Sequence, residues 1–148
     1  MNDHKAWSKD IKESQDHAVN YSMIGAPNLD VVKAFDMLPA DAGDTSEGRS
    51  AMDNVTARSA FIIGPDNKIK ATLTYLMTTG RNFIQILRLL DSCQLTAAEQ
   101  VATPANWNQG EKIIIVPVVS NEAVAEKYPE GWESPLPYLR LVKQPTRN

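Results

Sequence analysis

The chain has 148 residues, of which 43% are hydrophobic, and its 15 Lys and Arg against 18 Asp and Glu give a formal net charge of -3. This length suits one globular domain, with room for a smaller appended lobe. Since the charges are mixed and form no basic run, the composition argues against binding to nucleic acid or to an anionic membrane. The longest apolar run, Ile113 to Val119, contains Pro117 and is far shorter than the roughly 20 residues that span a bilayer.

The start of the sequence and its cysteine content indicate a cellular setting. Met1 to Lys5 is polar and does not resemble a secretory signal segment. Cys93 is the single cysteine, so it has no partner for an internal disulfide. We therefore expect a reducing, cytoplasmic location.

The first third of the chain predicts two helices, one strand and a loop. Residues 3–14 carry Trp7 and Ile11 at positions i and i+4 among charges, which is typical of an exposed amphipathic helix. A strand is expected at Val19 to Ile24, ended by the turn residues 25–28, and a short helix at Val31 to Phe35. Residues 39–54 are rich in Asp, Gly, Ser and Ala and predict a long surface loop.

A hairpin is expected next. Ala60 to Ile63 is a continuous apolar run, which predicts a strand buried on both faces, and Gly64 to Asn67 is a turn signal. From Lys68 to Tyr75 apolar and polar residues alternate, which predicts a half-exposed strand near a sheet edge.

The remainder of the chain predicts one further helix and one further strand. A helix is expected to start with Thr78 or Thr79 as its N-cap and to pack on the sheet, because Phe83, Ile86, Leu87 and Leu90 lie at i, i+3, i+4 and i+7. Beyond residue 103 prolines break the pattern, and only Lys112 to Val116 predicts a strand.

Five sequence stretches resemble the one-cysteine peroxiredoxins, a family of thiol peroxidases, and the likeness extends from Trp7 to Pro145. The stretches are Val55 to Lys68, Thr79 to Phe83, Val101 to Trp107, Gly131 to Trp132 and Pro137 to Arg140. The resemblance implies an α/β fold: a partial thioredoxin-like domain over residues 1–97, followed by the C-terminal lobe of the one-cysteine subfamily over residues 98–148.

The same resemblance implies that part of the central sheet is missing. In the family, two middle strands come before the stretch that resembles this chain, and they would separate the strand at Tyr21 to Ile24 from the hairpin at Ala60 to Tyr75. Unpaired strand edges favour aggregation or rearrangement. We therefore expect marginal folding of the isolated chain, as a shortened product or gene model or as a degenerate paralogue.

The reactive cysteine of the family lies in a Pro-x-x-x-Thr-x-x-Cys loop, which this sequence lacks. The resemblance implies that Arg58 is the arginine that stabilises the thiolate and the peroxide by hydrogen bonds. The alternative is a charged residue that merely opens a strand. Arg81 matches a family position at the periphery of the active site or in the dimer interface, and a surface salt bridge is the competing interpretation.

Cys93 does not replace the missing nucleophile. The family pattern would require proline and threonine where the sequence has Ile86 and Leu90. Cys93 is also expected at the C-terminal end of its helix, where the negative end of the dipole opposes thiolate formation. An ordinary, partly buried structural thiol is the expectation, with a reactive or regulatory thiol as the alternative.

The remaining residue types indicate no second centre. His4 and His17 have no ligand spacing between them or with a cysteine, and they predict surface histidines. The resemblance places Trp7, Trp107 and Trp132 where the family packs an aromatic side chain against the core or the lobe. It also implies that neither a metal nor an organic cofactor is needed.

Three functional interpretations follow. The first is a peroxiredoxin-type antioxidant protein that reduces hydrogen peroxide and alkyl hydroperoxides with thiols in its intact form, and is inactive as this chain alone. The second is a non-catalytic module that forms a homodimer or pairs with a full-length peroxiredoxin through the strand Ile69 to Tyr75. The third, a scavenger that uses Cys93 alone, requires a depressed thiol pKa.

Overall fold

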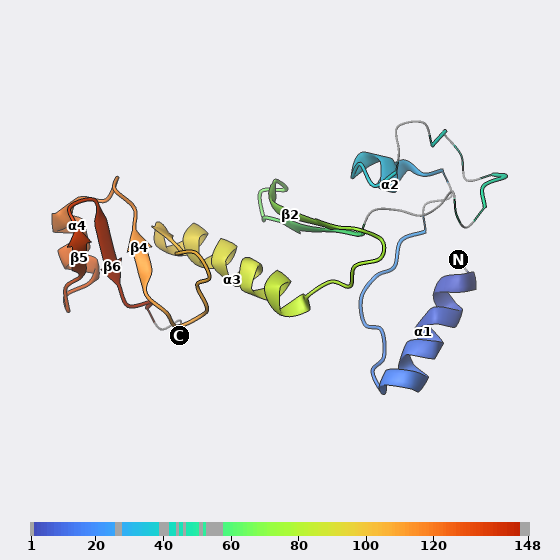
Figure 1. The fold of residues 1–148 in the computed structure, drawn as a ribbon, viewed down its shortest axis with the longest axis horizontal. Helices are drawn as coiled ribbons and strands as arrows, with labels where there is room; N and C mark the ends of the chain where they lie inside the picture. Colours follow the sequence, from blue (N-terminus) through green and yellow to red (C-terminus); the bar gives the residue numbers. More distant parts are fainter. Residues whose placement is uncertain are drawn as a thin grey trace. The chain divides into compact units, whose positions relative to one another are not determined.

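A computed structural model shows how the chain folds (Figure 1), and it describes residues 2–25, 28–38, 42–43, 45, 47–50, 52 and 58–145. The chain divides into two compact units, Met1–Arg58 and Ser59–Asn148. The boundary expected between residues 97 and 98 stays a prediction.

Among its described residues the first unit has two helices, both expected from the sequence. Helix α1 spans Asn2–Gln15 and α2 spans Asp30–Ala34. Lys9 and Glu13 form an exposed ion pair along α1 at 3.6 Å. Trp7 is exposed, so the expected packing of this side chain against a core is wrong.

The strand expected at Val19 to Ile24 is also wrong. The structure has no strand over these residues, and the side chains of Tyr21 and Ile24 are exposed. A strand is stable only where a neighbour satisfies its backbone groups, and the described strands pair among themselves later in the chain.

Several sequence features of this unit fall on residues outside the description. Ala26 and Pro27 of the expected turn, much of the expected loop 39–54, and residues 55–57 of the first family stretch all lie outside the described residues. The described parts of the loop form turns, bends and irregular structure, as expected.

The expected hairpin opens the second unit, apart from Arg58, which is the last residue of the first unit. Strand β1 spans Arg58–Ile63, β2 spans Ile69–Tyr75, and the two form a sheet of their own. The turn is closed by the amide of Gly64, which donates to the carbonyl of Lys68 at 2.9 Å. The alternation along β2 is confirmed, because Ala71, Leu73 and Tyr75 are more buried than the residues between them. Ile63 is 50% exposed, so burial of β1 on both faces is wrong: a sheet of two strands leaves too little to cover it.

Helix α3 spans Phe83–Glu99 and differs from expectation at its start. Asn82, rather than Thr78 or Thr79, is the N-cap, and its side-chain oxygen accepts from the amide of Gln85 at 3.1 Å. Packing on the hairpin sheet is also wrong for the first two turns, whose apolar side chains are mostly exposed. The opposite end of α3 is the packed one, where Leu95 is buried.

The C-terminal lobe has its own antiparallel sheet in the order β3-β4-β6-β5, formed by Val101–Ala102, Ile113–Ile115, Leu139–Val142 and Glu133–Leu136. Only β4 was expected from the sequence. Helix α4 covers Asn121–Lys127 and is capped by the Ser120 hydroxyl, which accepts from the amide of Ala123 at 3.3 Å.

A single apolar cluster holds the lobe together. Its buried members are Leu95, Val101, Trp107, Ile113, Ile115, Val124 and Val142. Trp132 and Tyr128 pack against the cluster, so the expected packing of Trp107 and Trp132 is confirmed. Within the described residues, no helix combines the length and the apolar character needed to cross a bilayer.

Candidate functional site

Arg58 is the first residue of β1 and is half-buried. The strand is tied to β2 one residue later, because the hydroxyls of Ser59 and Thr74 lie 3.0 Å apart. None of the hydrogen bonds or ion pairs among the described residues engages the Arg58 guanidinium. A guanidinium with open donors can receive an anionic group such as a thiolate or a polarised peroxide.

Arg81 lies in the segment between β2 and α3 and is exposed. Its neighbour Asn82 caps α3, and the Tyr75 hydroxyl donates to the Gln85 side chain at 3.3 Å, so the start of the helix is attached to the end of β2. No described ion pair contains Arg81, which leaves the competing interpretation of a salt bridge without support among the described residues.

Cys93 is half-buried on α3, six residues before the helix ends at Glu99. The expected position of Cys93 at the C-terminal end of its helix is therefore wrong, and the helix dipole acts only within the last turn. The Thr96 hydroxyl donates to the carbonyl of Cys93 at 3.2 Å, and no described interaction engages the sulfur. The described contacts do not bring Cys93 together with Arg58 or Arg81.

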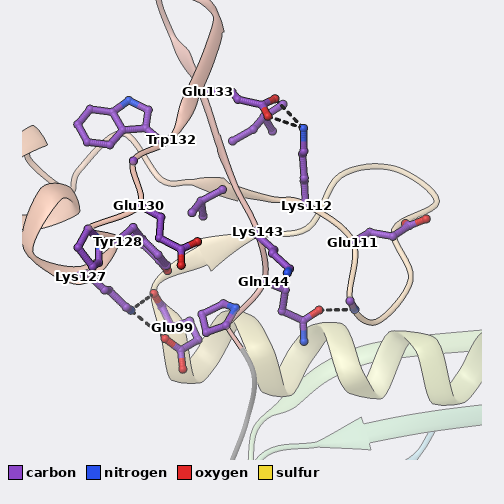
Figure 2. Close-up of a pocket in the computed structure, with 16 residues that line it drawn as sticks. Glu99, Glu111, Lys112, Lys127, Tyr128, Glu130, Trp132, Glu133, Lys143 and Gln144 are labelled. Atoms are coloured by element: carbon purple, nitrogen blue, oxygen red, sulfur yellow. Dashed lines mark hydrogen bonds and ion pairs between the residues drawn. The ribbon is translucent and has the colours of Figure 1, made fainter.

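The structure adds a hollow in the lobe that the sequence did not reveal (Figure 2), with a volume of about 1100 Å³. Its walls come from the end of α3, the loop before β4, the segment 127–133, and the end of β6 with the residues that follow. These segments are far apart in sequence. Gly131 and Trp132 belong to one of the family stretches, but no sequence pattern links the four segments into one site.

Two ion pairs line this lobe pocket. Lys127 lies 2.9 Å from the Glu99 carboxylate and donates to the Glu99 carbonyl at 2.8 Å, while Lys112 lies 2.6 Å from Glu133. A third contact joins the Gly110 amide, as donor, to the Gln144 side chain at 2.6 Å. These contacts fasten the pocket walls to one another and neutralise most of their charge.

Tyr128 is the unusual group of the lobe pocket. Its hydroxyl is buried and has no hydrogen-bond partner among the described residues. Burial raises the pKa of the phenol above its ordinary value of 10.0, and the neighbouring Lys127, 5.7 Å from the ring centroid, opposes that rise. No carboxylate of the pocket is hydrogen-bonded to this phenol to take its proton, so Arg58 remains the stronger candidate.

Comparison with known proteins supports the family resemblance. The family model for the C-terminal domain of 1-Cys peroxiredoxin matches residues 92–131. A probable 1-Cys peroxiredoxin from Syntrichia ruralis is 40% identical over 90% of this chain and 60% of its own length. The 1-Cys peroxiredoxin from Dictyostelium discoideum is 39% identical over 99% of this chain and 57% of its own length. Peroxiredoxin-6 from Mus musculus is 39% identical over 98% of this chain and 66% of its own length.

Solved structures agree. A yeast mitochondrial 1-Cys peroxiredoxin superposes with a TM-score of 0.80 at 36% identity, covering 95% of this chain and 64% of that chain. A cysteine-to-serine mutant of peroxiredoxin 6 from Arenicola marina superposes with a TM-score of 0.82 at 39% identity, covering 99% of this chain and 67% of that chain. The chain thus spans about three fifths to two thirds of the length of its relatives, and the expected α/β, thioredoxin-like peroxiredoxin fold class is confirmed. The chain belongs to the one-cysteine peroxiredoxin family.

Proposed function

We propose that this chain supplies the arginine-bearing part of a thiol peroxidase. The observation that carries the proposal is Arg58, at the motif position of the family and with its guanidinium free of described partners. In the proposed reaction, a cysteine thiolate attacks one peroxide oxygen, the O–O bond breaks, and the second oxygen leaves with a proton as water or an alcohol. Arg58 donates hydrogen bonds to both anions as charge develops.

The cycle closes with two equivalents of an external thiol. The first thiol attacks the sulfenic acid and releases water to give a mixed disulfide, and the second releases the cysteine as a thiol with formation of a disulfide. The substrates are hydrogen peroxide and alkyl hydroperoxides, and no metal or organic cofactor takes part in these steps. A cytoplasmic setting stays a proposal motivated by the single cysteine, and cell fractionation measures it.

The proposal includes inactivity of the chain by itself, since it lacks the Pro-x-x-x-Thr-x-x-Cys loop. With hydrogen peroxide and a thiol reductant, we expect the chain to consume peroxide no faster than its Cys93→Ser variant. Rapid turnover that disappears in Cys93→Ser would contradict this and would make Cys93 the nucleophile. The Arg58→Ala variant is a second control. Because Cys93 has no described contact with Arg58, this variant should consume peroxide at the same rate as the unmodified chain.

A companion measurement tests the role of Arg58. The intact mass of the protein from its native cells, followed by peptide sequencing, establishes whether a longer form carries the Pro-x-x-x-Thr-x-x-Cys loop. In such a form, Arg58→Ala should lower peroxidase activity about 100-fold, the size of effect seen when one donor to a developing anion is lost. Activity within twofold of the parent would remove Arg58 from the proposal, and Arg81→Ala provides the matched arginine control.

A second candidate function is favoured by the hairpin. Strand β2 pairs with β1 alone in a two-stranded sheet, so its other edge is open among the described residues. An open edge can pair with a second chain, either as a homodimer or with a full-length peroxiredoxin. Thr72→Pro should abolish such an association, whereas Thr72→Ala should preserve it, as measured by co-purification at micromolar concentration.

A further inference from the structure

The lobe pocket has the size and the wall chemistry of a ligand-binding site. Its volume of about 1100 Å³ is just above the range of about 300 to 1000 Å³ that is usual for small-molecule pockets. Tyr128, Pro129 and Trp132 give it aromatic and aliphatic wall. Apolar walls that carry a few polar groups at defined places are typical of such pockets, because the apolar part supplies affinity and the polar groups fix the orientation of the ligand.

The walls of the pocket are fixed by contacts within the second unit. The two ion pairs described above and the hydrogen bond from the Gly110 amide to Gln144 join segments that are distant in sequence. Tyr128 and Trp132 also pack against the apolar cluster of the lobe. All lining residues belong to the second unit, so the pocket needs no contribution from the first unit.

Two charged side chains of the pocket have no partner among the described residues. They are Glu130, in the segment after α4, and Lys143, directly after β6 (Figure 2). Four of the other charged groups neutralise one another in the two ion pairs, and the Glu111 carboxylate accepts from the Asn108 amide at 2.7 Å. One carboxylate and one ammonium on different segments are therefore open to a ligand.

The signs of these two charges limit the kind of ligand. A carboxylate accepts hydrogen bonds from an ammonium group, and a lysine donates them to a carboxylate. A ligand with a single charge would leave either Glu130 or Lys143 without a partner, and a polyanion would be repelled by the Glu130 carboxylate. A short peptide with free ends carries an ammonium, a carboxylate and apolar side chains, whereas a single amino acid has the same end groups but is small for this volume.

We propose that the lobe pocket binds short peptides whose two ends are free. The peptide ammonium donates to Glu130, the peptide carboxylate accepts from Lys143, and an apolar side chain of the peptide packs against Trp132. The inference goes beyond the proposed peroxidase function and does not depend on it, because neither Arg58 nor Cys93 lines the pocket.

Isothermal titration calorimetry of the full chain with the tripeptide Ala-Phe-Ala tests the proposal. We expect one peptide to bind per chain. Acetylation of the peptide amino end and amidation of its carboxyl end should each weaken the affinity about 10-fold, the size of effect expected when a hydrogen bond to a charged group is lost.

Two variants connect each end of the peptide to its partner. Glu130→Gln should weaken binding of the free tripeptide about 10-fold and should no longer distinguish it from the acetylated form. Lys143→Gln should lose the distinction between the free and the amidated form in the same way. Glu126→Gln and Lys68→Gln are the matched controls, since both residues are exposed and lie outside the pocket lining, and they should leave all affinities unchanged.

The variants are expected to remain folded, because Glu130 and Lys143 are exposed and have no described partner to lose. Circular dichroism before each titration verifies this point. Absence of binding at millimolar tripeptide would overturn the proposal, as would equal affinity for the free, acetylated and amidated forms. Dependence on the carboxyl end alone would also overturn it and would assign the pocket to the C-terminus of a larger polypeptide.

The peroxidase proposal is measured separately, by peroxide consumption, so failure of one leaves the other in place. Peptide binding by a chain without peroxidase activity would support the present inference alone. Equal weakening by the pocket variants and by their matched controls would show that the net charge of the chain governs binding, and it would contradict a peptide site in the lobe.

Discussion

Arg140 shows that a residue from a family motif can have a structural role. Its guanidinium donates to the Asn121 side chain at 2.8 Å and to the carbonyls of Val116 and Val119 at 2.9 and 2.8 Å. It therefore fixes the turn between β4 and α4 from the neighbouring strand β6. The sequence could identify Arg140 only as part of a motif, since its partners lie about twenty residues away.

The Arg140→Lys variant should destabilise the lobe by about 1 to 3 kcal/mol, because an ammonium cannot make these planar contacts simultaneously and partly buried carbonyls lose their donors. Urea unfolding followed by tryptophan fluorescence measures the change. Lys143→Ala, at an exposed position without a described partner, should remain within about 0.5 kcal/mol of the parent. Equal effects from the two variants would show that Arg140 contributes nothing specific.

Substitution of Tyr128, unlike that of Arg140, is expected to stabilise the lobe. Since its hydroxyl is buried without a partner, Tyr128→Phe should increase the free energy of unfolding by about 1 kcal/mol. Burial raises the folded-state pKa of Tyr128 above its ordinary value of 10.0, because ionisation of the phenol is less favourable in the folded chain than in the unfolded chain. The free energy of unfolding is therefore at its full value below pH 10.0 and falls as pH rises through the folded-state pKa. The loss of stability in alkali should therefore be smaller in Tyr128→Phe, and an unchanged profile would contradict this account.

At the scale of elements, the sequence predicted which helices and strands exist better than it predicted where they begin and end. The period of α3 and the alternation of β2 were sufficient to identify both, because each depends on local side-chain spacing. The start of α3 was missed because several residues before it can cap a helix, and the choice depends on the path of the turn. Strands β5 and β6 were missed because Pro135 and Pro137 obscure them and their pairing is non-local.

The assignment of Asn82, rather than Thr78 or Thr79, as the N-cap of α3 can be tested directly. Asn82→Ala should lower the free energy of unfolding by about 1 kcal/mol, because the Gln85 amide loses its acceptor. Thr78→Ala and Thr79→Ala should have smaller effects, since neither residue is the cap. Thermal unfolding monitored by circular dichroism compares the three variants. A larger effect at Thr79 would restore the boundary expected from the sequence.

The candidate site illustrates what a single sequence can and cannot provide. Arg58 was identified because a contiguous motif surrounds it, whereas the lobe pocket was not, because four separate segments form its walls. The predicted strand at Val19 to Ile24 failed for a related reason. Its residues have strand character, but strand formation depends on a neighbour that the local pattern does not specify.

At the scale of the whole molecule, burial is unequal between the two units. The apolar cluster of the lobe extends from Leu95 to Val142, whereas the first unit has Leu29 and Leu38 as its buried apolar residues among those described. Regions with few buried contacts open at lower free energy than packed ones. The two units should therefore differ in the ease with which they open.

Amide hydrogen exchange should reveal this difference. Peptides from β4, β6 and the last turns of α3 should exchange at least tenfold more slowly than peptides from α1, whose helix is largely exposed. Mass spectrometry after pulse labelling measures the rates, and the urea-unfolded chain provides the reference for each peptide. Uniform protection across both units would contradict the inequality in packing.

Confinement of the lobe cluster to residues 95–142 also has a consequence for how the protein can change over generations. A substitution before Arg58 replaces no member of that cluster, so selection for a folded lobe alone places little restriction on residues 1–57. Within the lobe, by contrast, a change at Trp107 or Ile113 alters contacts with several strands at once. The lobe should therefore retain its sequence longest, even in descendants whose first unit has diverged.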